Sequence, residues 1–406
     1  MSPDVHATLI GLNYAPEPTG IAPYTTAAAD GLAAAGMQVT AITGYPHYPQ
    51  WRITDGYDGW SRKDLVDTVQ VLRLRHPVPT RGNLVTRTLM EFIFGLRAVT
   101  ASWSGADVVL AVTPALLATA QVVARARLTR RPVVVWVQDI YTLSAAETGS
   151  ATAASGLISR VESWTLRNAD RVIVIHDRFA GFVTERLGVD PERVDVVRNW
   201  THLSGPDPLP SAATRQRHGW ADDETVVLHA GNMGTKQNLE SVVRASQLAA
   251  ARGSRVRFVL LGDGHRRASL EAMGANPNLQ FMDPLPAAEF ASTLASADIL
   301  LVNERPGMTE MSVPSKLTSY FNSGRPVLAA VDARSVTSGE IRASGGGVRV
   351  APDDPEGLLR AAEELAADPE LARRLGASGL EYRRTTLSAD TALAALADSL
   401  RSARRT

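Results

Sequence analysis

The chain has 406 residues, which exceeds what one hydrophobic core normally serves and suits two domains of roughly 150–200 residues each. Its 45% apolar, 21% charged and 6% aromatic residues exclude a disordered, collagen-like or coiled-coil protein. Basic and acidic residues both number 42, so no basic surplus indicates a dedicated nucleic-acid binder. The absence of cysteine excludes disulfides, zinc–thiolate sites and thiol nucleophiles.

The N-terminus is expected to enter the fold without an export signal. Residues 1–5 are too few for a signal peptide, and the apolar run 7–12 predicts a first strand. The longest apolar stretch, 108–123, is interrupted by Thr113 and Pro114, so we predict a strand, a turn and a helix rather than a membrane span. We therefore expect a cytoplasmic protein, at most peripheral on the inner face of the plasma membrane.

Short apolar runs alternate along the chain with longer segments of helical period. Strands are predicted at 7–12, 38–43, 69–73, 107–112, 132–137 and 171–175, and again at 225–229, 255–262, 279–282, 299–302, 326–331 and 347–350. Helices are predicted at 24–35, 84–102, 116–128 and 155–168, and at 239–252, 265–273, 287–295, 315–323 and 355–365. Apolar strands separated by helices indicate parallel α/β sheets covered on both faces.

The segment 201–221 carries Gly205 and three prolines, a composition typical of a linker. We therefore predict two doubly wound, Rossmann-like domains, at 1–200 and 222–385. A helix in 386–406 is a candidate for crossing back to the first domain. Open parallel sheets bind ligands beyond the carboxyl ends of their strands, so two facing sheets predict a site in the cleft between them.

The loop after the first strand can receive an anion. Pro16 and Pro18 delay the following helix, and Gly20 permits a backbone conformation or a close approach that a Cβ would forbid. The helix start behind it would present free N–H groups to a diphosphate. The alternative is an ordinary strand-to-helix loop.

The second domain opens in the same way. Gly231, Gly234 and Lys236 lie in the turn after strand 225–229, which suits a phosphate or a ribose. Gly262 lies at the end of the next strand, where a nucleotide base could lie against the backbone. His229 is either a core histidine or a ligand contact.

Lysine is rare in this chain, with only Lys63, Lys236 and Lys316 beside 39 arginines. Lys316 falls within the first turn of the predicted helix 315–323, where the helix dipole disfavours a cation unless an anion accompanies it. Because Lys236 also lies in a glycine-bearing turn, we predict that both lysines contact phosphate. Lys63 is expected to be solvated.

A series of motifs, in order along nearly the whole chain, resembles glycosyltransferase family 4 of the GT-B fold, and most of all its colanic-acid and O-antigen polysaccharide subgroup. These are Asn13-Tyr14-Ala15-Pro16-Glu17 to Gly20, Gly44-Tyr45-Pro46-His47-Tyr48-Pro49, Gln138-Asp139, Arg198-Asn199-Trp200, Gly231-Asn232-Met233-Gly234 and Pro314-Ser315-Lys316-Leu317.

The resemblance implies a nucleotide-sugar donor held mainly by the second domain, an acceptor held by the first, and retention of the anomeric configuration. The donor-binding residues that it implies are Gly20, Asn232, Gly234, Lys236, Gly262, Met282, Met311, Ser312, Val313, Ser315 and Ser319. The acceptor-binding residues are Glu17, His47 and Tyr48. Gly20, Gly234 and Lys236 would lie by the diphosphate, and Met282 near the base.

Two positions depart from the family. Where the wider family carries two glutamates eight residues apart, this chain has Met311 and Ser319. Glu310 is one residue from the first position and is the candidate to accept a hydrogen bond from a hydroxyl of the donor sugar. Nothing acidic replaces the second, which usually holds the ribose.

Catalysis is assigned to Asp139, Lys316 and Glu310. Asp139 follows strand 132–137. It either orients or deprotonates the acceptor hydroxyl or contacts the forming oxocarbenium, or it instead caps the next helix. In a front-face retaining reaction the departing phosphate takes the proton, and the lysines with backbone N–H groups stabilise its negative charge. No Asp-x-Asp metal clamp is evident, so we predict a metal-independent enzyme without a cofactor.

Residues 84–99 of the predicted helix 84–102 are amphipathic and basic, with Arg87, Arg97 and the preceding Arg81 beside leucines and phenylalanines. Arg125, Arg127, Arg130 and Arg131 form a second basic group. These features suit an anionic membrane leaflet that carries a lipid-linked acceptor. They equally suit a core helix with solvated arginines.

The function expected is transfer of a sugar from a nucleoside diphosphate, UDP before others, to a hydroxyl of a glycan, glycolipid or metabolite. One alternative is a non-hydrolysing UDP-sugar epimerase, which needs acid/base residues around the sugar carbons. A second is a non-catalytic nucleotide-sugar-binding partner, which Met311 and Ser319 make conceivable.

Overall fold

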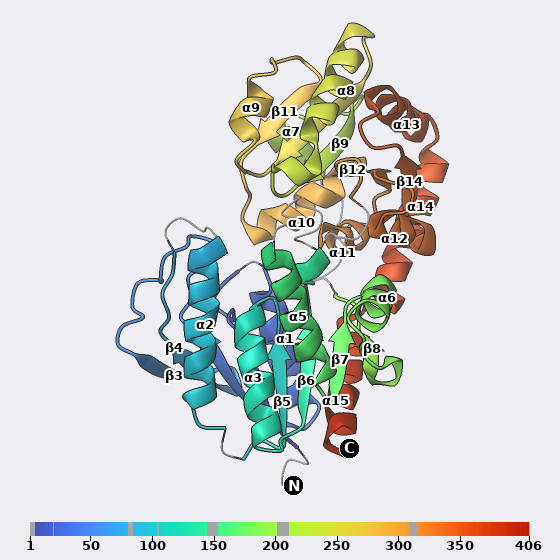
Figure 1. Cartoon of the computed structure of the whole chain (residues 1–406). Coiled ribbons are helices and arrows are strands. Elements are labelled where there is room, and N and C mark those ends of the chain that lie inside the picture. The colour runs from blue at the N-terminus through green and yellow to red at the C-terminus, as the bar shows by residue number, and fades with distance from the viewer. Residues whose placement is uncertain are drawn as a thin grey trace. The chain divides into compact units, whose positions relative to one another are not determined.

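The computed structural model describes residues 5–18, 20–79, 84–103, 105–143, 153–200, 211–308 and 315–405 (Figure 1). The chain divides into two compact units. The first comprises residues 1–202 together with 389–406, and the second comprises residues 203–388. Each unit is built on its own sheet.

The first unit contains an eight-stranded sheet whose strand order reverses around β1. In spatial order it consists of β3 (Ser61–Val66), β4 (Val69–Leu74), β2 (Gln38–Gly44), β1 (His6–Ile10), β5 (Val108–Val112), β6 (Val133–Val137), β7 (Arg171–Val174) and β8 (Val194–Val196). Every neighbouring pair is parallel except β3–β4. Two strands were not predicted from the sequence: β3, an edge strand that is largely exposed and polar, and β8, which has only three residues.

Helices cover both faces of this sheet. One face carries α1 (Ala22–Ala34) and α15 (Ala389–Arg405). The other carries α2 (Leu84–Thr100), α3 (Leu116–Leu128), α5 (Ala153–Arg167) and α6 (Asp177–Glu185), the first three of them side by side in Figure 1. Leu396 and Leu400 of α15 are buried in the same core cluster as Leu32 of α1. The C-terminal helix is therefore part of the first unit.

The second unit has a six-stranded, all-parallel sheet. Its spatial order is β11 (Leu279–Met282), β10 (Val256–Leu261), β9 (Thr225–Ala230), β12 (Ile299–Asn303), β13 (Val327–Ala330) and β14 (Gly347–Val350). This is the 3-2-1-4-5-6 order of dinucleotide-binding sheets. The order reverses between β9 and β12, which makes the carboxyl ends of these two strands the expected ligand position.

Both faces of the second sheet are also covered. Its helices are α7 (Ala212–His218), α8 (Leu239–Ala251), α9 (Arg267–Glu271), α10 (Ala287–Ser296), α11 (Ser315–Asn322), α12 (Val336–Ser344), α13 (Pro355–Ala367) and α14 (Pro369–Thr385). Core residues of α8 and α13 pack on one face, and those of α10, α11 and α12 on the other.

The structure differs from the predicted linker at 201–221. Residues 201–210 lie outside the described residues, but α7 occupies much of the rest. The Ser211 side chain accepts a hydrogen bond from the N–H of Thr214 at 3.3 Å, and Gly219 ends the helix in a left-handed conformation. Arg215 ties α7 to the second sheet through Asp298 at 3.0 Å.

The parallel α/β architecture predicted from the sequence is confirmed, and every predicted strand corresponds to a strand of the structure. Among the described residues, no helix combines the length and apolar character that crossing a membrane requires.

Candidate functional site

Strands β9 and β12 separate at the point where the order of the second sheet reverses. Their pairing includes Ile299 with Val227 and Leu300 with Leu228, and no pairing continues beyond these residues. The hydroxyl of Tyr320, on α11, accepts a hydrogen bond from the N–H of Ala230 at 2.9 Å and lies 3.3 Å from the carbonyl oxygen of Leu301. This buried hydroxyl replaces a missing ladder bond and fastens α11 beneath the carboxyl ends of both strands.

Lys316 lies four residues before Tyr320, and therefore on the same face of α11. Its Nζ is 3.7 Å from the position that a Cβ on Gly231 would occupy, so the amine adjoins the turn after β9. Burial lowers the pKa of Lys316 from its ordinary value of 10.5 to about 8, and the carboxylate of Glu304 opposes this shift. A partly desolvated cation beside a glycine turn is a suitable partner for a phosphate.

His229 is fully buried on β9, below the same turn. Within the described part of the chain, neither ring nitrogen has a partner of good hydrogen-bond geometry. Burial, and next the charge of Lys316, hold its pKa well below the ordinary range, so the ring is neutral. His229 is therefore a core histidine beside the site, and full burial argues against direct contact with a ligand.

The turns after β9 and β10 touch through glycines. Gly262 has φ +134°, and a Cβ there would come within 2.1 Å of the carbonyl oxygen of Gly231. A Cβ on Gly264 would lie 2.5 Å from the carbonyl oxygen of Met233. The N–H of Gly262 donates to the carbonyl of Met282 at 2.9 Å, so this turn continues to the end of β11.

The segment that carries Lys236 is a 3-10 turn, Thr235–Gln237, rather than the start of the long helix. The Gln237 side chain accepts a hydrogen bond from the N–H of Gly234 at 3.1 Å, and Asn238 then adopts a left-handed conformation before α8 begins. Lys236 is exposed, as is Asn232. The carbonyl of Lys236 accepts the N–H of Arg305 at 2.9 Å, which joins the loops after β9 and β12.

Two residues that the sequence analysis did not select complete this arrangement. Asn303, which ends β12, donates from Nδ2 to the carbonyls of Gln237 and Asn238 at 2.7 and 2.9 Å. Glu304 accepts a hydrogen bond from Thr337 at 2.6 Å and faces the charge of Lys316. The only sequence signal for either was a polar pair that directly follows an apolar strand.

Part of the predicted donor site lies outside the described residues. Glu310, Met311, Ser312 and Val313 fall there, as does the side chain of Ser315. Ser319, where the family usually places an acid, is 8% exposed and lies three residues after Lys316 on α11.

In the first unit, a small hollow adjoins the carboxyl ends of β1 and β5, where the strand order reverses. Gly11 and Asn13 line it from the β1 turn, Ile21 from the start of α1, and Thr113 from the β5 turn. Gly20 precedes Ile21 with φ +69°, and a Cβ there would lie 3.4 Å from the ring of Tyr48. Within the described residues, the N-terminus of α1 has no side-chain cap.

Glu17 and His47, which were predicted to contact an acceptor, are both buried, and Nδ1 of His47 lies 3.0 Å from the carbonyl oxygen of Tyr45 and 3.3 Å from Glu17 Oε1. Glu17 Oε1 accepts the N–H groups of His47 and Tyr48 at 2.8 and 2.9 Å, and Oε2 accepts from Asn13 at 2.8 Å. The His47 ring stacks edge-on against His76, whose pKa burial lowers to about 4. Glu17 therefore holds the loop that presents the half-buried Tyr48 beside Gly20.

Asp139 follows β6 on a loop whose backbone N–H groups are hydrogen-bonded to several side chains. Its Oδ1 accepts the N–H of Ile140 at 2.9 Å, and Thr113 Oγ1 accepts the N–H of Gln138 at 2.9 Å. The next two amides, of Tyr141 and Thr142, donate to Glu162 rather than to Asp139. Asp139 and Glu162 thus share the backbone N–H groups that follow β6, and the roles predicted for Asp139 stay predictions. Asp139 itself is partly exposed at the carboxyl end of its strand.

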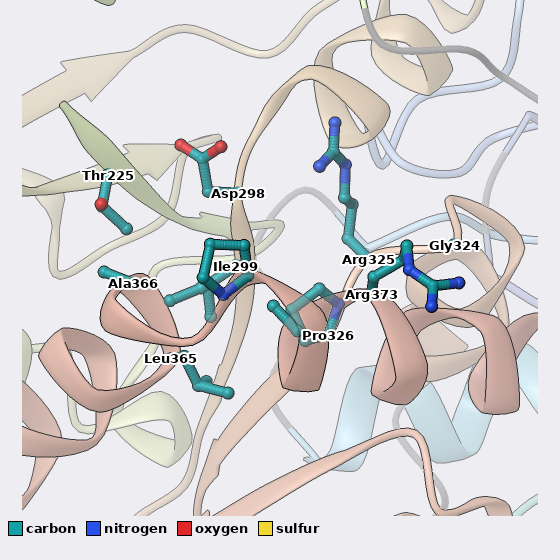
Figure 2. Close-up of a pocket in the computed structure, with 11 residues that line it drawn as sticks. Thr225, Asp298, Ile299, Gly324, Arg325, Pro326, Leu365, Ala366 and Arg373 are labelled. Atoms are coloured by element: carbon teal, nitrogen blue, oxygen red, sulfur yellow. The ribbon is translucent and has the colours of Figure 1, made fainter. Parts of the chain in front are cut away.

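A separate pocket lies on the second unit (Figure 2). It is lined by Thr225, Ile299 and Pro326, which stand at the amino ends of β9, β12 and β13, and by Arg325 and Arg373. Because this is the opposite edge of the sheet from Lys316, the pocket is not part of the candidate site.

Comparison with known proteins identifies the family. Residues 19–200 match the model of a glycosyl transferase 4-like domain, and residues 224–368 match glycosyl transferases group 1. Glycosyl transferase WcaI of Escherichia coli (strain K12), which its name assigns to colanic acid biosynthesis, is 29% identical over 340 residues, covering 80% of this chain and 82% of WcaI.

Solved structures share the whole fold. Sucrose-phosphate synthase from Thermosynechococcus elongatus superimposes with a TM-score of 0.74 at 18% identity, covering 98% of each chain. HepE of Anabaena, in complex with UDP-glucose, gives a TM-score of 0.68 at 14% identity, covering 98% of this chain and all of HepE. The chain therefore belongs to the glycosyltransferases of the GT-B fold and is an enzyme of that transferase class, with a glycosyl transferase 4-like domain followed by a group 1 domain.

Proposed function

We propose that this glycosyltransferase moves a sugar from a UDP-sugar to a hydroxyl of a glycan, glycolipid or small metabolite, with retention of configuration. The observation that carries the proposal is the partly desolvated Lys316 beside the Gly231 turn, where β9 and β12 separate. A nucleoside diphosphate is the ligand that this chemistry fits. The binding of UDP-glucose by HepE and the assignment of WcaI to a polysaccharide support the choice of UDP and of a glycan.

In the proposed reaction the acceptor oxygen bonds to the anomeric carbon as the bond from that carbon to the diphosphate oxygen breaks. The proton of the acceptor hydroxyl passes to the departing phosphate oxygen, and the nucleoside diphosphate leaves with that proton. Lys316, Lys236 and backbone N–H groups of the Gly231–Gly234 turn stabilise the negative charge that develops on this phosphate. Asp139 orients the acceptor hydroxyl, and Glu310 accepts a hydrogen bond from a donor-sugar hydroxyl.

The first test measures binding and turnover together. A panel of UDP-, GDP- and dTDP-sugars is screened for a rise in Tm, since a ligand of the native state stabilises it by mass action. We expect UDP-sugars to raise the Tm and Lys316→Ala to abolish the rise, while Lys63→Ala, on the exposed strand β3, leaves it unchanged. A Tm that no nucleotide raises would refute the proposal.

The product distinguishes the alternatives. In a retaining transfer from an α-linked donor, NMR shows an α-linked product, and a β-linked product would refute retention. An acceptor-independent change of sugar stereochemistry would identify an epimerase. Donor binding without transfer or hydrolysis would indicate the non-catalytic partner.

Metal independence is a further part of the proposal, because the two lysines offer the charge that a divalent ion would otherwise supply. Turnover is expected to persist undiminished in excess chelator. Loss of turnover that Mg²⁺ or Mn²⁺ restores would overturn this part while leaving sugar transfer in place.

We also propose that the enzyme works at an anionic membrane surface. Val85, Leu89, Phe92 and Leu96 form one solvent-facing stripe along α2, each about half exposed or more. The helices α2, α3 and α5 carry six arginines (Arg87, Arg97, Arg125, Arg127, Arg160 and Arg167). Their two acids, Glu91 and Glu162, are both buried, so an apolar, basic surface remains, which suits anionic lipid.

Vesicle flotation tests this surface. The protein should float with vesicles that contain anionic lipid and not with purely zwitterionic ones. Leu89→Ser with Phe92→Ser should weaken flotation, whereas Leu65→Ser, on the equally exposed edge strand β3, should not. Equal flotation with both kinds of vesicle, or with neither, would remove the membrane proposal.

A further inference from the structure

Two buried glutamates from different helices converge on the loop that carries Asp139. Glu162 of α5 is 3% exposed, and Glu91 of α2 is 8% exposed. They are the only acidic residues in α2, α3 and α5. Neither was selected from the sequence.

Glu162 holds the backbone of this loop. Its Oε1 accepts the N–H of Tyr141 at 2.8 Å and its Oε2 accepts the N–H of Thr142 at 3.0 Å. Both carboxyl oxygens are thus used on two consecutive amides, directly after Asp139 and Ile140. Such paired contacts fix the orientation of a peptide segment and not merely its position.

Glu91 holds the same loop from the other side. The hydroxyl of Tyr141 donates to Glu91 Oε1 at 2.6 Å and also lies 2.9 Å from the carbonyl oxygen of Pro114. Glu91 Oε2 accepts the N–H of Leu117 in the first turn of α3 at 3.3 Å. One residue, Tyr141, is therefore held by its main chain from α5 and by its side chain from α2.

The arrangement is costly for stability alone. Burying a carboxyl group carries a desolvation penalty, and burial raises the pKa of both Glu91 and Glu162. Apolar residues of similar volume often stabilise a fold as well as buried ionisable groups do. Two such groups on one short loop therefore indicate that the placement of the loop matters for function.

We infer that Glu91 and Glu162 are positioning residues, which together clamp the loop after β6 and so fix the carboxylate of Asp139 toward the acceptor. This inference rests on the proposed role of Asp139 in sugar transfer. It assigns to α2 and α5 an inner face that serves the reaction, in addition to the outer face proposed for the membrane.

The test compares Glu162→Gln, Glu91→Gln and Tyr141→Phe with a matched control. Glu340 of α12 is 5% exposed and accepts a hydrogen bond from Tyr382 at 3.1 Å, so Glu340→Gln makes the same chemical change in the second unit. Each clamp variant should lower kcat by roughly 10–100-fold, as expected for a displaced reacting group. The KM for the donor and the UDP-induced rise in Tm should stay unchanged.

Two further readouts separate positioning from general stability. The Glu91→Gln/Tyr141→Phe double variant should lose less kcat than the product of the two single losses, because both substitutions alter the shared contact between the Tyr141 hydroxyl and Glu91. In amide hydrogen exchange, Tyr141 and Thr142 should exchange faster in Glu162→Gln, while the β6 amides keep their protection. Tyr141→Phe removes a single hydroxyl and is the milder change. If a glutamate variant does not fold, the kcat of Tyr141→Phe still tests the clamp.

Folded variants with unchanged kcat, additive losses in the double variant, or unchanged exchange at Tyr141 and Thr142 would each overturn the clamp. A wild-type protein that transfers no sugar would instead refute the proposed function, and the exchange experiment would then decide the clamp by itself. An equal loss of donor binding in all variants, the Glu340→Gln control included, would show general destabilisation and would also overturn it.

Discussion

At the scale of single residues, the second unit concentrates its chemistry on one lysine. Lys316 can keep a low pKa only because burial removes water from the ammonium, and the single carboxylate of Glu304 compensates incompletely. A diphosphate would supply the missing negative charge. The same burial that disfavours a lone ammonium therefore favours its pairing with an anion.

This reasoning predicts a pH dependence. Because the pKa of Lys316 is about 8, the ammonium is present at lower pH and is lost as the pH rises through that value. The kcat/KM for the donor, which reports the free enzyme, should fall about tenfold per pH unit above it. In Lys316→Arg, kcat/KM for the donor should no longer fall above about pH 8, because arginine stays charged. Its value below that pH should be lower than in the wild type, because the guanidinium has a different shape. An unchanged alkaline limb in this variant would contradict the assignment.

A second residue-scale prediction concerns the glycine contact between the two turns. Gly262→Ala should lower the free energy of unfolding of the second unit by more than about 1 kcal/mol, because its Cβ would meet the backbone oxygen of Gly231 at a strained φ. Gly253→Ala is the control, since φ is also positive there but the space is open. Urea unfolding should show a much smaller loss for the control, and equal losses would contradict the steric explanation.

At the scale of elements, α11 is attached to the sheet by its own side chain. Tyr320→Phe removes the acceptor of the Ala230 N–H and leaves that group buried without a partner, at a cost of about 1–3 kcal/mol. Since Lys316 is on the same helix face, the variant should also weaken UDP binding, measured by calorimetry. Tyr45→Phe, which removes a hydroxyl bonded to the Asp58 carbonyl in the first unit, should leave UDP binding unchanged.

The elements also show what the sequence could predict. Buried parallel strands are continuous apolar runs, so β5, β6 and β12 were visible, and so were the glycine turns that follow strands. The edge strand β3 carries no such run. Contacts between residues far apart in the chain, such as Tyr320 with Ala230 or Glu162 with Tyr141, leave no local pattern. For the same reason the sequence did not show that Glu17 binds the backbone N–H groups of His47 and Tyr48.

At the scale of the whole molecule, the chain folds as two units, and its last helix belongs to the first of them. Residues 389–406 follow the second unit in sequence but bury Leu396 and Leu400 against the first sheet and α1. The first unit is therefore completed only after residues 389–405 have been synthesised. Its stability depends on α15, whereas the proposed donor residues Lys316 and Lys236 lie entirely in the second unit.

Calorimetry of the full chain tests this division, since separate cores give separate unfolding transitions. Leu396→Ala should cost about 2–5 kcal/mol, because it opens a cavity in the core beneath α15, and should lower one transition by roughly 5–15 °C. Leu365→Ala, equally buried in α13, is the matched control and should lower the other transition. UDP should raise only the transition that Leu365→Ala lowers, because the lysines belong to that unit. If UDP raised the transition lowered by Leu396→Ala, or if both variants lowered one shared transition, the nucleotide would not be held by the second unit as an independent body.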